Sequence, residues 1–125
     1  MFNYITLGSN NVGRSQAFYD SALAPLGYRR LESHDNMIGY GAVQPLLYLM
    51  TPQDKQAATN GNGTMICLAA PDRAAVDAFH AAALAAGGKD EGGPGIRAKV
   101  HENFYAAYVR DPDGNKLSAV CDKAP

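Results

Sequence analysis

The sequence has no tryptophan and contains only two cysteines and three histidines among its 125 residues. Cys67 and Cys121 each lie in a hydrophobic, strand-like run, so we expect two buried free thiols in a cytoplasmic protein and no disulfide scaffold. The formal net charge is only −1, which leaves no basic footprint for nucleic acid or an anionic membrane. No apolar run approaches the length of a membrane span. These absences favour a soluble protein whose partner is a small, roughly neutral ligand or another protein chain.

What the chain does contain is an internal repeat. Residues Asn3 to Gly27 align with Thr64 to Gly88 at a constant offset of 61 and without a gap. Such a duplication predicts two copies of one module, with a site between them. Because 125 residues suffice for one compact domain but not for two, we expect the modules to share a core. The expected domain covers 1–125, with module one at about 1–52, a linker at about 53–62 and module two at about 63–125.

Each copy has the pattern of a strand, a helix and further short strands, which predicts two βαβββ modules of the α+β class. In the first copy Asn11 can cap the helix, which Pro25 and Gly27 end. In the second copy the helix opens at Pro71-Asp72 and ends at Gly87-Gly88. The predicted strands are 2–7, 28–31, 37–42 and 46–50 in module one, and 65–68, a short strand near 89–90, Val100, 105–110 and 116–120 in module two.

Three segments are predicted to be irregular. Loops are expected at 51–63, between the modules, and at 92–95, before the last strands. The motif Asp111-Pro112-Asp113-Gly114-Asn115 predicts a hairpin turn, because Pro fixes φ whereas Gly and Asn tolerate positive φ. We interpret this motif as structural.

Several stretches carry a resemblance to a known superfamily. They are Tyr4-Ile5-Thr6-Leu7-Gly8, the runs Arg14 to Asp20 and Leu23 to Tyr28, and Tyr108-Val109-Arg110-Asp111-Pro112-Asp113-Gly114-Asn115. On these motifs the chain resembles the vicinal oxygen chelate superfamily, which includes glyoxalase I, bleomycin-resistance proteins and extradiol dioxygenases. The resemblance implies βαβββ modules whose strands form a curved, open barrel-like mixed sheet with a central cavity, commonly in a homodimer. It does not imply a substrate, because glycines, turns and core aromatics preserve architecture across many chemistries.

In metal-using members of that superfamily, four strands each supply one ligand, usually His, Gln or Glu. The resemblance places Tyr4, Tyr48, Met65 and Ser118 at those positions. A tyrosine would have to lose a proton with a pKa of about 10, methionine is a soft donor and serine is a poor ligand. We therefore expect neither the four-ligand divalent metal site nor a cofactor. The donor pairs that a relocated metal site would use are His34-Asp35 and His101-Glu102.

The predicted cavity has an aromatic and soft-atom lining. Tyr4 and Thr6 share one strand face, and Met65 and Cys67 are their partners in the repeat. Seven tyrosines against four phenylalanines favour recognition through polar-tipped rings. The alternative is that most of these side chains fill the core. The predicted pocket residues are Tyr4, Thr6, Tyr40, Tyr48, Met65, Cys67, Tyr105, Tyr108 and Ser118.

Two functions stay open. The first is a metal-free protein that binds a small organic ligand, as antibiotic-sequestering relatives do. The second is a glyoxalase- or dioxygenase-type enzyme, a lyase, isomerase or oxygenase, that uses metal through other ligands or acid/base chemistry by His101 and Tyr105. The missing ligands favour the first. Module exchange in the dimer, and a role of the linker as a lid, stay open as well.

Overall fold

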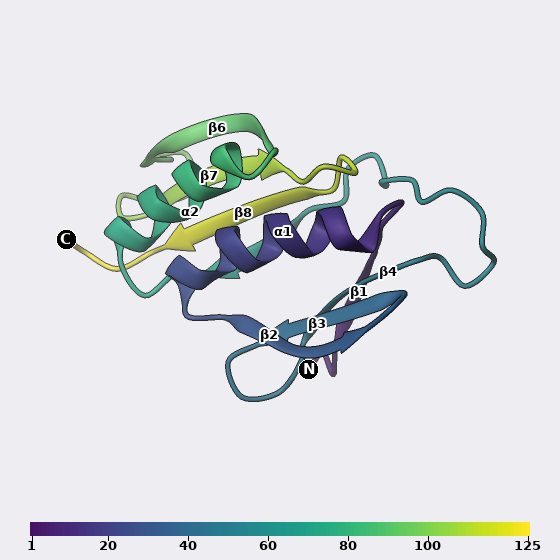
Figure 1. Cartoon of the computed structure of the whole chain (residues 1–125). Coiled ribbons are helices and arrows are strands. Elements are labelled where there is room, and N and C mark those ends of the chain that lie inside the picture. The colour runs from purple at the N-terminus through teal and green to yellow at the C-terminus, as the bar shows by residue number, and fades with distance from the viewer.

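The order of elements repeats in the computed structural model, which describes residues 1–125. Both halves run β-α-β-β-β, as predicted, and the fold class is α+β (Figure 1). Module one consists of β1 (Ile5–Gly8), α1 (Val12–Leu23), the 3-10 turn η1 (Ala24–Leu26), β2 (Arg29–His34), β3 (Met37–Gly41) and β4 (Leu47–Met50). Module two consists of β5 (Ile66–Ala69), α2 (Arg73–Ala85), β6 (Lys89–Ile96), β7 (Tyr105–Arg110) and β8 (Lys116–Cys121).

Both helices begin at the caps that the sequence predicts. The side chain of Asn11 accepts a hydrogen bond from the backbone N–H of Arg14 at 3.0 Å, and the Asp72 carboxylate accepts one from Ala75 at 2.8 Å. Such a bond satisfies one of the N–H groups left free at a helix start. α1 runs into η1, after which Gly27 takes a φ of 87° that side chains disfavour. Neither helix has the length and apolar run that a bilayer crossing requires.

Each module forms its own mixed four-stranded sheet, and no ladder joins the two sheets. The strand orders are β1-β4-β3-β2 and β5-β8-β7-β6, with the first strand parallel to its neighbour in each. α1 packs on β2, β3 and β4, whereas α2 packs on β6, β7 and β8, so a helix covers one face of each sheet. The helices also pack against each other and build one core from both modules (Figure 1). Its fully buried large side chains include Phe18, Tyr19, Leu49, Val76, Phe79 and Leu117.

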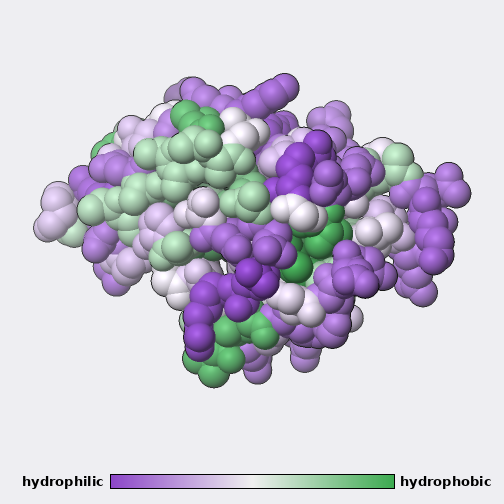
Figure 2. Space-filling view, viewed as in Figure 1, coloured by the Kyte–Doolittle hydropathy of each residue, from purple (hydrophilic) through white to green (hydrophobic).

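The outer side of α2 is built mainly of alanine. Ala74, Ala78, Ala81 and Ala85 are exposed there, and Figure 2 shows this region as a pale green, weakly hydrophobic area beside more hydrophilic surface. Alanine has the highest helix propensity, so these positions support the helix without being buried. The opposite side of α2 carries Val76 and Phe79 into the core.

The structure corrects the prediction of a loop at 92–95. These residues belong to β6, where Gly92 pairs with Tyr108 and Gly95 pairs with Ala106, with register shifts around Gly92. β6 lies at the edge of its sheet, and an edge strand tolerates Pro94 because one side of it needs no N–H partner. The local sequence favours a loop, but pairing with β7 overrides that preference.

Other strand predictions differ as well, and β2 continues to His34, beyond the predicted 28–31. The first strand begins at Ile5 and not at Phe2, and Val100 lies in a turn and not in a strand. The predictions of 105–110 and of the strand from Lys116 agree with β7 and β8. Strand ends are set by where a partner strand stops, which a single segment does not reveal.

The hairpin turn at Asp111 to Asn115 is confirmed. The N–H of Asp111 donates to the Asn115 carbonyl at 2.9 Å, and Gly114 has a φ of 89°. The carboxylate of Asp111, only 3% exposed, accepts bonds from the N–H groups of Asp113 and Asn115, each at 2.9 Å. The turn is therefore organised around one buried negative charge.

The same turn attaches module two to module one. The fully buried Tyr19 of α1 donates its hydroxyl to Asp111 at 2.6 Å, and burial together with this carboxylate raises the Tyr19 pKa well above its ordinary value. Asp113 accepts bonds from the guanidinium of Arg14 at 2.7 Å and from the backbone N–H of Asn10 at 3.0 Å. These contacts join the start and the buried side of α1 to the β7–β8 turn.

We predict that Tyr19→Phe lowers the free energy of unfolding by about 1–3 kcal/mol, because it leaves a buried carboxylate oxygen one donor short. Urea unfolding of the purified protein measures this change. The control is Tyr28→Phe, which removes an exposed hydroxyl that donates to the Ala69 carbonyl at 3.3 Å. We expect the control to stay within about 0.5 kcal/mol of the unmodified protein. Equal losses in both variants would contradict a special role of the Tyr19–Asp111 bond.

Candidate functional site

Each sheet has one face that no helix covers. In β4, Leu47 and Leu49 point into the core, so the alternate side chains Tyr48 and Met50 lie on the other side of the sheet. The first open face is this side of the module-one sheet, made of Tyr4, Thr6, Glu32, Met37, Gly39, Tyr48 and Met50. The second open face is the matching side of the module-two sheet, made of Met65, Cys67, Gly92, Tyr108, Lys116, Ser118 and Val120.

Two hollows lie on the first open face. A shallow one of about 310 Å³ is lined by Tyr4, Thr6, Met37, Tyr48 and Met50. The other, of about 550 Å³, lies between β1 and the linker and shares Tyr4, Thr6 and Met50 with the first. Both hollows therefore continue into one another along β1.

The linker forms the outer wall of the larger hollow. The Asn10 side chain holds it at Ala58, accepting from the backbone N–H at 2.7 Å and donating to the carbonyl at 3.1 Å. A Cβ added at Gly8 would lie 2.8 Å from the Ala58 Cβ, so only glycine permits this close approach. The linker is thus attached to module one at a defined point.

A polar chain crosses the first open face. The Glu32 carboxylate accepts a bond from the Tyr48 hydroxyl at 3.0 Å and lies 3.0 Å from Nε2 of His34. The Tyr48 ring meets the Tyr4 ring edge to face, with centroids 5.4 Å apart. Gly39 makes room for it, because a Cβ there would lie 2.7 Å from the Tyr48 ring. The result is an aromatic pair whose hydroxyl end is held by a carboxylate.

These hydrogen bonds shift the pKa values of Glu32 and Tyr48. The hydrogen bond from His34, and then that from Tyr48, lowers the pKa of Glu32. Loss of hydration, and then the bond to Glu32, raises the pKa of Tyr48. At neutral pH the carboxylate is therefore ionised and the phenol is protonated. Sequence reasoning did not identify Glu32. It pairs with Gly39, which pairs with Tyr48, so its nearness to Tyr48 follows only from the strand register.

Strand pairing relates the two open faces residue by residue. A row of paired positions runs Thr6, Tyr48, Gly39, Glu32 across the first sheet. The equivalent row in the second sheet runs Cys67, Ser118, Tyr108, Gly92. Tyr48 is therefore equivalent to Ser118, the two residues that the resemblance places at matching ligand positions, and a tyrosine stands beside a glycine in both rows. The order of tyrosine and glycine is shifted by one strand, and only the first row ends in a charged residue, Glu32.

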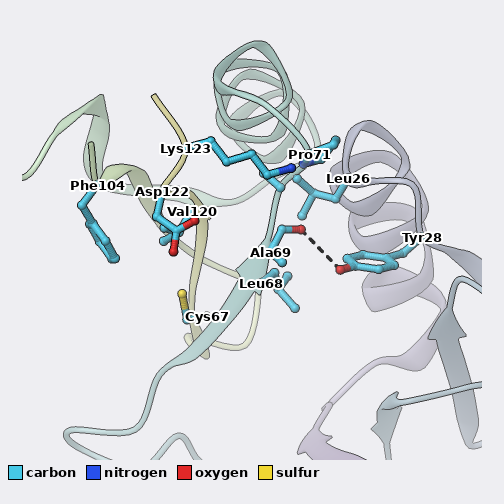
Figure 3. Close-up of a pocket in the computed structure, with 11 residues that line it drawn as sticks. Leu26, Tyr28, Cys67, Leu68, Ala69, Pro71, Phe104, Val120, Asp122 and Lys123 are labelled. Carbon is cyan, nitrogen blue, oxygen red and sulfur yellow. Dashed lines mark hydrogen bonds between the residues drawn. The ribbon is translucent and has the colours of Figure 1, made fainter. Parts of the chain in front are cut away.

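A third hollow, of about 580 Å³, follows the free edge of β5 (Figure 3). Cys67 and Val120 extend it onto the second open face, and Phe104 lies at its far side. The hydroxyl of Tyr28 points across it to the Ala69 carbonyl, so both modules contribute to its wall. The groove is mostly apolar, with Asp122 and Lys123 at the C-terminal end of the chain.

The structure places some predicted pocket residues elsewhere. Tyr40 is 1% exposed and donates its hydroxyl to Asp20 of α1 at 2.7 Å, so it belongs to the core. Tyr105 also lies on the helix side of its sheet, where its hydroxyl donates to Asp77 of α2 at 2.6 Å. Tyr105 is two residues from the core residue Ala107 on the same strand, so both side chains lie on the core side of the sheet.

The remaining candidates are separated too. Nδ1 of His101 accepts a bond from Asn103 within its own turn at 3.1 Å, and no hydrogen bond joins it to Tyr105. Cys121 is a buried free thiol, as expected, but Cys67 is exposed, because β5 turns that side of its edge strand away from the core. Tyr4, Thr6 and Tyr48 are brought together on one face, whereas Met65, Cys67, Tyr108 and Ser118 lie on the other.

The residues at the family's metal positions do not fit a divalent ion. The Tyr48 hydroxyl already donates a hydrogen bond to Glu32, and Ser118 keeps a fully buried hydroxyl without a hydrogen-bond partner. Tyr4 and Met65 offer a phenol and a thioether, which hold hard or borderline cations weakly. No group of three or more His, Cys, Asp or Glu side chains is placed to hold a metal ion.

The fold and the sequence both match one superfamily. The model of the Glyoxalase/Bleomycin resistance protein/Dioxygenase superfamily matches residues 1–118, and the chain belongs to this superfamily. A glyoxalase/bleomycin resistance protein from Albidiferax ferrireducens T118 is 38% identical, with a TM-score of 0.86 over 96% of this chain and 97% of that one. The resemblance inferred from the sequence motifs is thereby confirmed.

Other solved structures show the same fold at lower identity. A glyoxalase-related enzyme from Fulvimarina pelagi is 20% identical, with a TM-score of 0.76 over 96% of this chain and 86% of that one. A lactoylglutathione lyase from Agrobacterium tumefaciens is 21% identical, with a TM-score of 0.66 over 96% of this chain and 91% of that one. Comparison with curated proteins gives no match.

We predict that Glu32→Gln lowers the pKa of Tyr48 toward the ordinary tyrosine value of about 10, because the phenolate no longer faces a negative charge. Tyr48 should then ionise at a lower pH than in the unmodified protein. A pH titration that follows the ring Cζ signal of Tyr48 by NMR measures this. Glu102→Gln, an exposed change in the turn before β7, is the control and should leave Tyr48 unchanged. No difference between the two variants would contradict the coupling.

Proposed function

We propose that the protein binds a small organic ligand on its open faces without the four-ligand metal site of its superfamily. The observation that carries the proposal is the Tyr4–Tyr48 pair over the hollow of the first open face, with the Tyr48 hydroxyl held by Glu32. A concave, mostly apolar hollow with a few fixed polar groups is typical of small-molecule sites. The ligand class is a small planar or apolar molecule with polar substituents.

The lining supports this class of ligand. Two tyrosine rings offer faces and edges for stacking, while the thioethers of Met37 and Met50 adapt to an irregular apolar shape. Ionised Glu32 accepts hydrogen bonds, so it favours a ligand with a hydroxyl or amine at that end. The shape and chemistry of the hollow thus select for an amphipathic molecule.

Binding is better supported than catalysis by the residues first considered for it. Proton transfer between His101 and Tyr105 needs the two side chains within hydrogen-bond reach. Tyr105 instead bonds to Asp77, and His101 bonds within its own turn. Location in the cytoplasm is part of the proposal and is supported by two free thiols, Cys67 and Cys121.

Titration with benzyl alcohol, a neutral aromatic probe, tests the proposal by isothermal calorimetry or NMR. We expect saturable binding that Tyr4→Ala and Tyr48→Ala each weaken at least about fivefold, because each removes half of the ring pair. Phe2→Ala is the control, because Phe2 is 72% exposed and lies outside the hollows. Chelation with EDTA should change nothing. Absence of saturable binding, or binding only after Zn²⁺ or Ni²⁺ is added, would overturn the proposal.

We propose further that two copies of the chain associate as a homodimer. The open faces carry exposed apolar residues, with Tyr4 56% and Met65 40% exposed, and β1 and β5 are edge strands that each have one free side. Exposed apolar surface beside free strand edges is typical of protein interfaces. The two open faces of one chain belong to separate sheets, so a second copy can close each of them.

We predict a dimer mass in analytical ultracentrifugation at micromolar concentration. Met65→Lys should shift the protein toward the monomer, because it places a charge in an apolar contact. Val43→Lys is the matched control: Val43 is 93% exposed but lies between β3 and β4, away from the open faces. A monomer mass for the unmodified protein, or equal effects of both variants, would argue against this dimer.

A further inference from the structure

The second open face holds an arginine without an acidic partner. Arg97 belongs to none of the chain's ion pairs, whereas Arg14, Arg30 and Arg110 each have a carboxylate partner. Its guanidinium lies over the Tyr108 ring, 5.2 Å from the centroid. A stacked guanidinium keeps its charge and its planar set of donors. Arg97 therefore presents an uncompensated positive charge.

The chain holds this guanidinium in one position. Nη1 donates to the Gly95 carbonyl at 2.8 Å and Nη2 donates to the Gly93 carbonyl at 2.7 Å. A Cβ added at Gly92 would lie 3.2 Å from both Nη2 and the Tyr108 ring, so a glycine there leaves room for the stack. An arginine has five N–H donors, and these two bonds leave the others for a ligand. A fixed donor set loses little conformational entropy when a ligand binds.

Charges of both signs lie near Arg97, but the two acidic ones are already bonded: Asp90 lies 2.9 Å from Nε2 of His80 and accepts the Gly92 N–H at 2.9 Å, and Glu91 pairs with Arg110. Lys116 places its ammonium 5.7 Å from the centroid of the same Tyr108 ring. Arg110 lies on β7, the strand of Tyr108, but it forms an ion pair with Glu91 at 2.9 Å. The first open face differs, because its fixed charge is the carboxylate of Glu32. The two faces therefore carry fixed charges of opposite sign, Glu32 on the first and Arg97 on the second.

A second polar group on this face also lacks a partner. The Ser118 hydroxyl is fully buried and makes no hydrogen bond, although Ser118 pairs directly with Tyr108 across the sheet. A buried hydroxyl normally has a partner. Ser118 lies directly beside Tyr108, the residue on which Arg97 stacks, so its hydroxyl is a further unused polar group at this position.

We propose that the second open face binds the anionic head group, a carboxylate or a phosphate, of the protein's small organic ligand. Arg97 is the main donor, Lys116 adds positive charge, and the guanidinium of Arg97 stacks on the Tyr108 ring. Planar guanidinium donors match the geometry of carboxylate and phosphate oxygens. The inference rests on the proposed function only in that the open faces hold the ligand, and it adds the ligand's charge.

Three probes of similar size test the inference by isothermal calorimetry: benzoate, phenyl phosphate and neutral benzyl alcohol. We expect the anions to bind more tightly than benzyl alcohol, and Arg97→Gln to weaken their binding at least about tenfold while sparing benzyl alcohol. Lys99→Gln is the matched control, because it removes one charge from an exposed position two residues away. The anion that binds more tightly identifies the head group.

Two measurements on the unmodified protein make the test independent of how the variants fold. Added NaCl should weaken benzoate binding more than benzyl alcohol binding, because salt screens the charge on Arg97 and Lys116. Bound benzoate should also slow the reaction of exposed Cys67 with a maleimide, whereas Cys121 is buried. Cys67 stands in the same row as Tyr108, two strands or roughly 10 Å away.

The outcomes separate the two proposals. Equal binding of benzoate and benzyl alcohol, with no effect of salt or of Arg97→Gln, would overturn the anion inference and leave the proposed ligand binding intact. Failure of all three probes to bind would overturn both. Loss of benzoate binding in Lys99→Gln to the same extent as in Arg97→Gln would show a diffuse charge effect and would also overturn the assignment.

Discussion

The bond between the Tyr19 hydroxyl and the Asp111 carboxylate is the contact on which the arrangement of the two halves depends. Both groups are buried, so neither can exchange its partner for water without moving α1 away from the β7–β8 turn. The other donors to Asp111 come from the turn itself, so the turn holds the carboxylate in position for Tyr19. One side chain from each module therefore sets the orientation of the two modules relative to each other.

This orientation explains where the candidate site lies. The helices pack on each other in the shared core, so the sheet faces opposite them are left open. Alternation along the strands then supplies those faces with every second residue, including Tyr48 and Tyr108. The residues free for ligand chemistry are thus the ones that the core does not use.

The two open faces show how one scaffold acquires different chemistry. Equivalent rows place a tyrosine beside a glycine in each sheet, but the ring stands on β4 in module one and on β7 in module two. Tyr48 reaches across Gly39 to Glu32, while Tyr108 carries Arg97. The superfamily fold is retained, and each open face combines an aromatic ring with a charged group.

The sequence by itself determined the duplicated βαβββ order, the helix caps at Asn11 and Asp72, and the Asp111 hairpin, because repeats, caps and turns are written in neighbouring residues. Only the tertiary structure decided that Tyr40 and Tyr105 face the helices, that 92–95 is a strand, and that Glu32 meets Tyr48. These outcomes depend on register between strands, and a shift of one residue turns every side chain to the opposite face.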